Sequence, residues 1–293
     1  MKRFLIIGDN SSLTGEPERI VEFKDYLAEV VGDSAQIDTV MFDTIVFELA
    51  KGRFEATVPG TDIDLKNYDA IYIRGNRVLG SIVSKYGHYH NIPCINDWSM
   101  YYNGNKVAQT IIFLEENVDF IPTYYAFDKQ VLKRYMAEKT GYPYILKTAA
   151  GSHGDSNYLI KSEADVDKAL SEEPDVDFLA QEYCPNDRDY RLLIVGDKSI
   201  LFERQGQAGS HLNNTSKGGS AARLPDETLP PRIYVEASRL AKRLGLIIAG
   251  FDVIPKLDSD ELYFLEINSQ PQLRTGLLLE DKKALLRDLF ESL

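Results

Sequence analysis

The sequence predicts an α/β layer over about its first hundred residues and mixed α+β structure over the rest. In the first region, short apolar runs alternate with stretches of helical periodicity, as βαβ units do. In the last third, apolar runs of strand length follow one another across polar turns, which favours an antiparallel sheet. A length of 293 residues corresponds to about two domains.

Composition excludes several classes of protein. With 44% hydrophobic residues, the chain is not intrinsically disordered, and a formal net charge of −12 argues against binding to nucleic acid. Cys94 and Cys184 are too few for a disulfide framework, which favours a reducing cytoplasm. The apolar run at 4–7 is shorter than the hydrophobic region of a signal peptide, and no run approaches the length of a membrane span, so no membrane partner is expected.

In the first region, apolar runs predict strands at 4–7, 70–73 and 92–95. Apolar residues three and four apart predict a helix over 18–31 with one buried face. A second helix is predicted to follow Arg77 and to end near Tyr89.

Helices and strands are mixed from Asn105 onward. One helix runs to about Glu116, and Asp128 is the predicted N-cap of another that ends at Thr140. Further strands are predicted at 144–147, 157–160, 178–183, 190–195, 199–204, 247–254 and 262–267, and further helices at 163–170, about 231–244 and 280–289. Residues 205–224 are rich in Gly, Asn and Ser, so they are expected to form a long loop.

A lysine and a glycine-rich turn form the first candidate site. Lys147 ends a predicted strand, and the turn after it contains Gly151, Ser152 and Gly154. Backbone N–H groups in such a turn can point at phosphate oxygens, and the lysine adds a point charge. This is not a Walker A motif, because the lysine comes first and no helix follows. On these residues alone, an ordinary hairpin loop with a surface lysine is the alternative.

Asp252, Glu266 and Asn268 form the second candidate site, on two predicted strands joined by a polar turn. Because side chains alternate along a strand, Glu266 and Asn268 share a face that Asp252 on the paired strand can reach. Two carboxylates and an amide suit Mg²⁺, which prefers oxygen ligands. The alternative is an exposed sheet face on which acidic residues alternate outward.

The order of these features resembles the ATP-grasp superfamily. The lysine and glycine-rich loop come first, Gln181-Glu182-Tyr183 follows, and the pattern Asp-x₁₃-Glu-x-Asn comes last. Within the superfamily, residues 105–272 are most similar to the branch of the ribosomal-protein S6 glutamate ligases. The resemblance implies an enzyme that phosphorylates a carboxylate with ATP and lets an amine displace the phosphate to form an amide.

The resemblance also implies an ATP-grasp fold in three parts. A Rossmann-like domain over 1–98 would precede two α+β subdomains, 99–184 and 185–293, that clasp ATP. The nucleotide would be contacted by Lys106, Lys147, Gly151, Ser152, Gly154, Gln181, Glu182, Tyr183, Cys184 and Asp189. Of these, 181–184 would read adenine through the backbone, and Asp189 would face the ribose.

Further roles concern the reacting groups. Attack of a carboxylate on the γ-phosphate brings anions together, so fixed cations must neutralise the charge. The resemblance assigns the reacting phosphate or acyl phosphate to Arg191 and Arg204, and it places Asn214 and Lys217, as further catalytic residues, in the active-site loop. It assigns Mg²⁺, with Mn²⁺ as a substitute, to Asp252, Glu266 and Asn268.

Substrate contacts are expected on the N-terminal side and in the long loop. Arg74 and Arg77 follow the strand at 70–73, where a guanidinium can hold a substrate carboxylate, although both could instead pair with surface acids. His211 is a further candidate substrate contact. Residues 151–156 and about 205–220 are expected to be mobile lids until nucleotide binds.

The substrates themselves stay open at the level of sequence. Leu212 replaces an arginine of the S6 ligases, and Gln270-Pro271-Gln272 replaces a Pro-Gly turn, both near the acceptor side. An amino acid, a peptide or a protein tail fits the reaction. The alternatives are an enzyme that makes ester or amide crosslinks within a peptide, and a silent nucleotide-binding regulator. The sequence is also compatible with a homo-oligomer.

Overall fold

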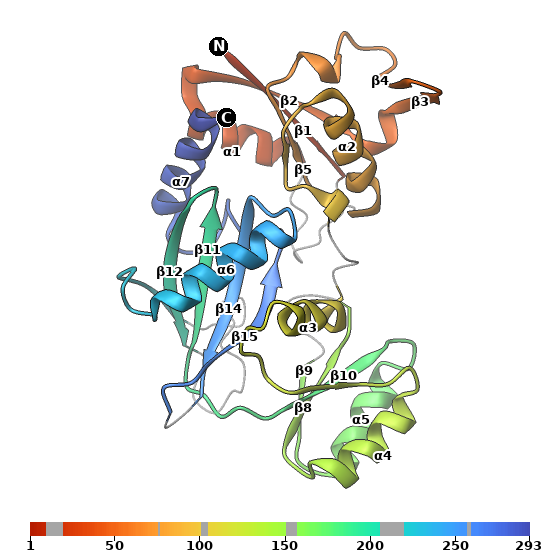
Figure 1. Ribbon diagram of the computed structural model, residues 1–293, viewed down its shortest axis with the longest axis vertical. Helices are drawn as coiled ribbons and strands as arrows, with labels where there is room; N and C mark the ends of the chain where they lie inside the picture. Colours follow the sequence, from red (N-terminus) through yellow and green to blue (C-terminus); the bar gives the residue numbers. More distant parts are fainter. Residues whose placement is uncertain (10–19, 76, 101–104, 151–156, 206–219, 257–258) are drawn as a thin grey trace.

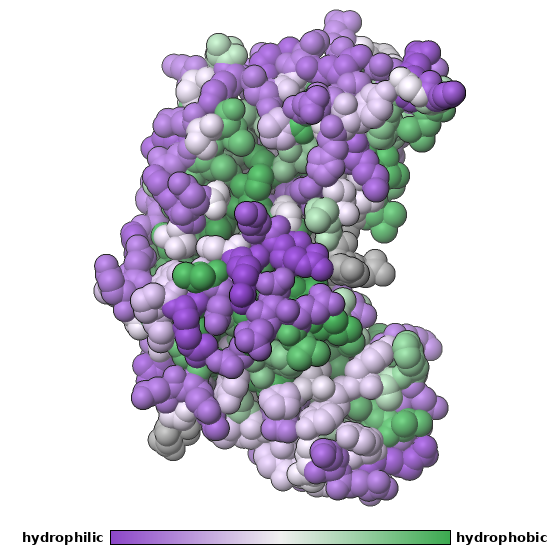
Figure 2. Space-filling model, in the orientation of Figure 1, coloured by the Kyte–Doolittle hydropathy of each residue, from purple (hydrophilic) through white to green (hydrophobic). Residues whose placement is uncertain are grey.

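The structure, a computed structural model, describes residues 1–9, 20–75, 77–100, 105–150, 157–205, 220–256 and 259–293. The three larger sheets with their helices follow one another along the long axis of the molecule (Figure 1). The N-terminal sheet lies at one end, the lobe with α4 and α5 lies at the other, and the five-stranded sheet lies between them. The surface is hollowed between the two ends (Figure 2).

The N-terminal sheet is parallel, with the strand order β2-β1-β5-β6. Its elements are β1 (Lys2–Gly8), α1 (Ile20–Val31), β2 (Ala35–Met41), β5 (Ala70–Ile73), α2 (Arg77–His90) and β6 (Cys94–Ile95). The predicted strands and helices are present here, although the strand expected at 92–95 is confined to β6 and residues 18 and 19 of the first helix lie outside the described residues. The strand β2 was not predicted, because polar residues interrupt its apolar ones. A mostly exposed hairpin of β3 (Val46–Ala50) and β4 (Arg53–Thr57) was missed for the same reason.

The central sheet is antiparallel, with the order β7-β10-β8-β9. Its elements are β7 (Thr123–Tyr125), α4 (Lys129–Lys139), β8 (Tyr144–Thr148), β9 (Asn157–Ile160), α5 (Glu163–Glu172) and β10 (Phe178–Glu182). As predicted, Asp128 caps α4, where its side chain accepts hydrogen bonds from the N–H groups of Gln130 and Val131. The two helices and the sheet enclose one small core.

The C-terminal sheet is antiparallel, with the order β13-β12-β11-β14-β15. Its elements are β11 (Asp189–Val195), β12 (Lys198–Gln205), β13 (Ser220–Leu224), α6 (Pro231–Arg243), β14 (Ile248–Pro255), β15 (Leu262–Asn268) and α7 (Leu279–Ser292). The expectation of a loop through residue 224 is wrong at its end, because β13 pairs with β12 there. This strand was not predicted, because its first four residues are small or charged and partly or fully exposed, so they show no alternation of apolar and polar residues.

Two cores border the C-terminal sheet. One contains residues of β1, α1 and α7 together with Leu193, Val195 and Ile200 of the C-terminal sheet, so the N-terminal layer and this sheet share apolar packing. The other contains Ile112 and Phe113 of α3 (Lys106–Glu115), which therefore packs on the C-terminal sheet although it precedes the central one in the chain. None of the described helices is long and apolar enough to cross a bilayer.

Candidate active site

The central sheet contributes a buried lysine. Lys147, on β8, is 6% exposed. Burial lowers the pKa of Lys147 to about 8, the charge of Lys106 acts in the same direction, and Glu266 and Asp252 act against it. Lys147 therefore lies within electrostatic reach of both Lys106 on α3 and the acidic residues of the C-terminal sheet.

The C-terminal sheet contributes the three oxygen-bearing residues. Asp252 on β14 lies opposite Glu266 on β15, and Asn268 lies opposite Gly250 two residues away. The Asn268 amide is 3.5 Å from the carboxylate of Asp252 (Nδ2 to Oδ2). The juxtaposition predicted for these residues is present, and their role as metal ligands stays a prediction.

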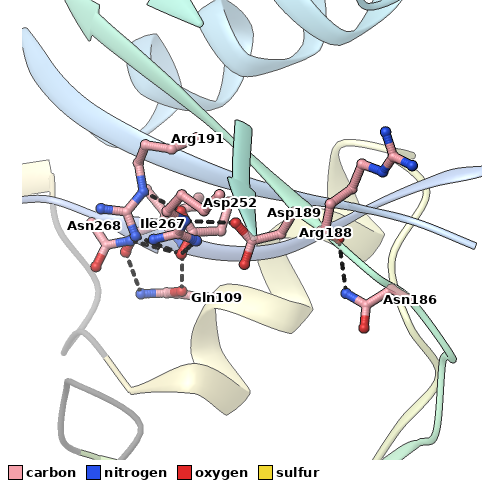
Figure 3. A network of polar contacts seen from close by, with 9 residues as sticks. Gln109, Asn186, Arg188, Asp189, Arg191, Asp252, Ile267 and Asn268 are labelled. Carbon is pink, nitrogen blue, oxygen red and sulfur yellow. Dashed lines mark hydrogen bonds and ion pairs between the residues drawn. The ribbon is translucent and has the colours of Figure 1, made fainter. Parts of the chain in front are cut away.

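Two arginines neutralise Asp252. Arg191 on β11 faces Asp252 across the ladder, and its Nε and Nη2 donate to the two carboxylate oxygens, with Nη2 at 2.7 Å from Oδ2 (Figure 3). Arg204 on β12 places Nη2 at 3.1 Å from the same Oδ2. Burial opposes ionisation of Asp252, but the two guanidinium groups outweigh burial and hold its pKa below the usual range.

Asp189 completes this network. It lies opposite Arg204 in the β11–β12 ladder, and its Oδ1 accepts a hydrogen bond from Nε of Arg204 at 2.6 Å. Burial raises the pKa of Asp189 to about 6, against the attraction of Arg204 and with the help of the Asp252 charge. The expected role of Asp189 at the ribose stays a prediction, and here its carboxylate is engaged by Arg204.

The predicted adenine strand lies at the end of β10. Gln181 is buried and donates from Nε2 to the hydroxyl of Thr123 at 2.8 Å, and the N–H of Glu182 donates to the Pro122 carbonyl at 3.0 Å. The side chain of Glu182 is exposed and accepts from the Tyr124 hydroxyl at 2.8 Å. Tyr183 and Cys184 are half-buried in the connection to β11. Their contact with a base stays a prediction.

The N-terminal sheet contributes Arg74 at the carboxyl end of β5. This arginine is 9% exposed, its guanidinium carbon lies 4.1 Å from the centre of the Phe23 ring, and Nη1 is 3.2 Å from the Tyr72 hydroxyl. Arg77 begins α2. The next residue after Arg74 connects this sheet to the C-terminal one: the side-chain amide of Gln270 accepts from the Gly75 N–H and donates to its carbonyl, both at 3.1 Å.

The remaining predicted residues lie outside the described part of the chain. They are Gly151, Ser152, Gly154, His211, Asn214 and Lys217. The two predicted lids, 151–156 and most of 205–220, fall there as well. Their roles stay predictions.

Sequence reasoning missed two buried polar side chains beside the site. Gln109 on α3 bonds to the backbone of Ile267, between Glu266 and Asn268. Lys282 on α7 donates to the Thr275 carbonyl at 3.0 Å, and burial together with nearby Arg191 lowers its pKa to about 8. Each lies at helical spacing from the buried apolar residues of its own helix, so the sequence could have indicated that both side chains are buried.

The donor set fits Mg²⁺. Asp252 and Glu266 carry carboxylate oxygens and Asn268 an amide oxygen, which are the hard ligands this ion prefers, and the oxygens of Asp252 are here shared with Arg191 and Arg204. Glu266 and Asn268 are half-buried, so part of the coordination shell is left for water and phosphate oxygens. The charges of both carboxylates act on the pKa of Lys147, so the lysine and these two residues belong to one electrostatic environment.

Known proteins are similar to this chain in sequence and fold. A "Probable alpha-L-glutamate ligase" of Pasteurella multocida (strain Pm70) is 26% identical over 228 residues, covering 75% of this chain and 71% of the relative. The "Alpha-aminoadipate--LysW ligase LysX" of Saccharolobus solfataricus is 28% identical over 196 residues, covering 62% and 67%. A solved structure, the RiPP-associated ATP-grasp ligase of Chryseobacterium gregarium in complex with ADP and a leader and core peptide, has a TM-score of 0.66 at 15% identity, covering 100% of this chain and 98% of that chain.

The family assignment follows from the extent of the match. The structural similarity shows a shared ATP-grasp fold. Residues 104–280, more than half of the 293, match the RimK-like ATP-grasp domain. The chain therefore belongs to the RimK-like ATP-grasp domain family and is an ATP-dependent carboxylate–amine ligase.

Proposed function

We propose that this ligase activates a carboxylate as an acyl phosphate between the central and C-terminal sheets and joins it to the amine of an amino acid, a peptide or a protein tail. The observation that carries the proposal is that α3 joins the two sheets: the Lys106 N–H donates to the Ala149 carbonyl beside the β8 strand of Lys147, and Gln109 bonds to Ile267 between Glu266 and Asn268. Such a junction holds cations and oxygen ligands around one phosphate chain. The names of two relatives, a glutamate ligase and an alpha-aminoadipate–LysW ligase, support substrates of this class.

Each part of the site has a proposed role. Lys106 and Lys147 neutralise phosphate oxygens of ATP, and 181–184 hold the base. Arg191 and Arg204 stabilise negative charge that spreads over the transferred phosphoryl group. Mg²⁺, held by Asp252, Glu266 and Asn268, would supply further neutralisation of the phosphates. The domain boundaries at 98 and 184 belong to the same proposal.

The substrate carboxylate is proposed to lie on the N-terminal side. Arg74 stands at the carboxyl end of a parallel strand, where ligands of open α/β sheets collect. The Gln270–Gly75 hydrogen bonds hold this strand end beside the end of β15. A carboxylate placed there would meet a guanidinium on one side and the phosphate site on the other.

The test is coupling of defined pools. We expect incubation with ATP, Mg²⁺, amino acids and peptides to yield ADP and, by mass spectrometry, a product that equals the sum of two substrates less one water. A peptide that loses water without gaining a partner would instead indicate internal crosslinking, and lability to mild base would identify an ester. Nucleotide binding without ADP release in any pool would contradict the ligase proposal and support a regulator.

Three narrower points are part of the proposal. Mn²⁺ is expected to replace Mg²⁺ in the assay, because both accept oxygen ligands. Cys94 and Cys184 are both free thiols, which suits a reducing cytoplasm. Self-association, to be measured by light scattering, and the absence of nucleic-acid binding at a net charge of −12 stay predictions.

A further inference from the structure

Gln109 is a buried carboxamide on a helix face that is otherwise apolar. It is 6% exposed, and the residues that follow on the same face of α3, Ile112 and Phe113, belong to the C-terminal core. A carboxamide is costly in such a place unless both of its polar ends are satisfied. Here Nε2 donates to the Ile267 carbonyl and Oε1 accepts from the Ile267 N–H, both at 3.0 Å (Figure 3). This pair of hydrogen bonds is called the amide link below.

The amide link holds the strand between two predicted metal ligands. Ile267 stands between Glu266 and Asn268, on β15, the last strand in the order of its sheet. On the side of β15 that faces away from β14, the Gln109 amide binds the backbone N–H and carbonyl to which a further strand would bind. Since side chains alternate along a strand, fixing both backbone groups of Ile267 also fixes the directions in which Glu266 and Asn268 project.

The start of α3 is fixed on the central sheet. The N–H of Lys106 donates to the carbonyl of Ala149, two residues after Lys147, at 2.8 Å. Asn105 caps the helix by accepting from the N–H groups of Val107 and Ala108 at 2.7 and 3.1 Å. Lys106 and Gln109 are three residues apart, so they lie on the same side of the helix.

We propose that Gln109 is a positioning residue, which holds Glu266 and Asn268 in register with Lys106 and Lys147 through one rigid turn of α3. The inference rests on the proposed metal site. The two lysines and the metal ligands come from different sheets, so their spacing must be set by a contact between the sheets. A buried amide that bonds at two points fixes both distance and orientation, which an apolar side chain in its place would not.

The test compares Gln109→Met with Ile112→Ala in the full chain. Gln109→Met keeps the length of the side chain and removes the amide link, whereas Ile112→Ala loosens the same helix on the same core and keeps the link. Mn²⁺ affinity is measured by electron paramagnetic resonance with AMPPNP present, alongside thermal melting, ATP KM and hydrogen exchange at the Ile267 amide. For Gln109→Met we expect Mn²⁺ to bind about 10- to 100-fold more weakly and the Ile267 amide to exchange faster. Ile112→Ala should lower the melting temperature and leave Mn²⁺ affinity nearly unchanged.

The possible outcomes distinguish a failure of the positioning role from a failure of the proposed metal site. If Glu266→Gln does not weaken Mn²⁺ binding, the metal site itself is wrong. If Glu266→Gln weakens Mn²⁺ binding and Gln109→Met does not, or if Ile112→Ala weakens it equally, the positioning role is wrong and the metal site stands. Should Gln109→Met not fold, Gln109→Asn keeps the carboxamide and shortens its reach, and unchanged Mn²⁺ affinity in that variant would also overturn the inference.

Discussion

Nη2 of Arg204 lies 3.1 Å from Oδ2 of Asp252, and both residues are almost fully buried. Nε of the same guanidinium reaches Asp189 at 2.6 Å. One buried cation therefore separates two buried carboxylates at the centre of the site. Removal of the cation would leave Asp189 buried without a cation beside Asp252, with Arg191 alone to neutralise Asp252, and breaking a buried ion pair in this way is more costly than replacing the whole pair by apolar groups.

Arg204→Met is therefore expected to destabilise the fold by about 3–5 kcal/mol, measured by urea unfolding. Adding Asp189→Asn should recover part of this loss, because Asp189 is the carboxylate left without a cation, whereas Asp252 keeps its pairing with Arg191. Arg223→Met is the matched control, since Arg223 is on the adjacent strand β13 and pairs with Asp281 at the surface. If the Arg204→Met variant is no less stable than the Arg223→Met variant, the buried network does not make this contribution to the free energy of unfolding.

Glu266→Gln is expected to abolish ADP formation in a chain that still folds. The substitution removes one anionic ligand and keeps the shape of the side chain, so the metal is underbound while the sheet is unchanged. Glu261→Gln makes the same chemical change at an exposed position just before β15, where Glu261 pairs with Lys256, and it should retain full activity. Wild-type turnover by a folded Glu266→Gln variant would defeat the metal assignment.

ATP affinity is expected to fall as pH rises above about 8. The pKa of Lys147 is near 8 in the free protein, below its usual 10.5, because burial disfavours the ammonium. Phosphates favour the charged form, so binding above this pH must take up a proton, and Kd rises by up to about tenfold per pH unit. Below pH 8 the lysine is already charged and the dependence levels off.

Calorimetry in buffers of different protonation enthalpy measures the proton uptake directly. Lys147→Arg is the control, because a guanidinium stays charged throughout this range and should flatten the profile. Lys282, whose pKa is also about 8, is present in both proteins and does not contribute to the difference. An equally steep profile for Lys147→Arg would assign the proton to another group.

Arg74→Ala is expected to raise the apparent KM for the carboxylate or amine substrate roughly tenfold or more, since a charged hydrogen bond is worth about 1.5–3 kcal/mol. The KM for ATP should change little. Arg3→Ala is the control: Arg3 also lies over an aromatic ring, 4.7 Å from the centre of Tyr68, but at the start of β1 rather than at a carboxyl end. A higher KM for ATP alone would move Arg74 to the nucleotide site.

The sequence by itself determined most of the buried strands and helices and the faces on which their side chains lie, but not the more exposed strands β2, β3, β4 and β13. The buried strand at 70–73, the N-cap at Asp128 and the alternation of Glu266 with Asn268 are all local patterns, and each is present in the structure. Periodicity reports which side of an element is buried, because burial repeats with the helix or strand period. The ATP-grasp fold was expected from the family resemblance that the order of the motifs carries.

The tertiary structure alone decided which polar groups meet. Gln109 and Ile267 are 158 positions apart, and Gln270 and Gly75 are 195 apart, so no local pattern pairs them. The sharing of Arg204 between Asp189 and Asp252 likewise depends on the register of three strands. A polar residue on an apolar helix or strand face predicts a buried side chain that needs a hydrogen-bond partner. The sequence does not identify the partner, because it comes within hydrogen-bond distance only when distant elements pack.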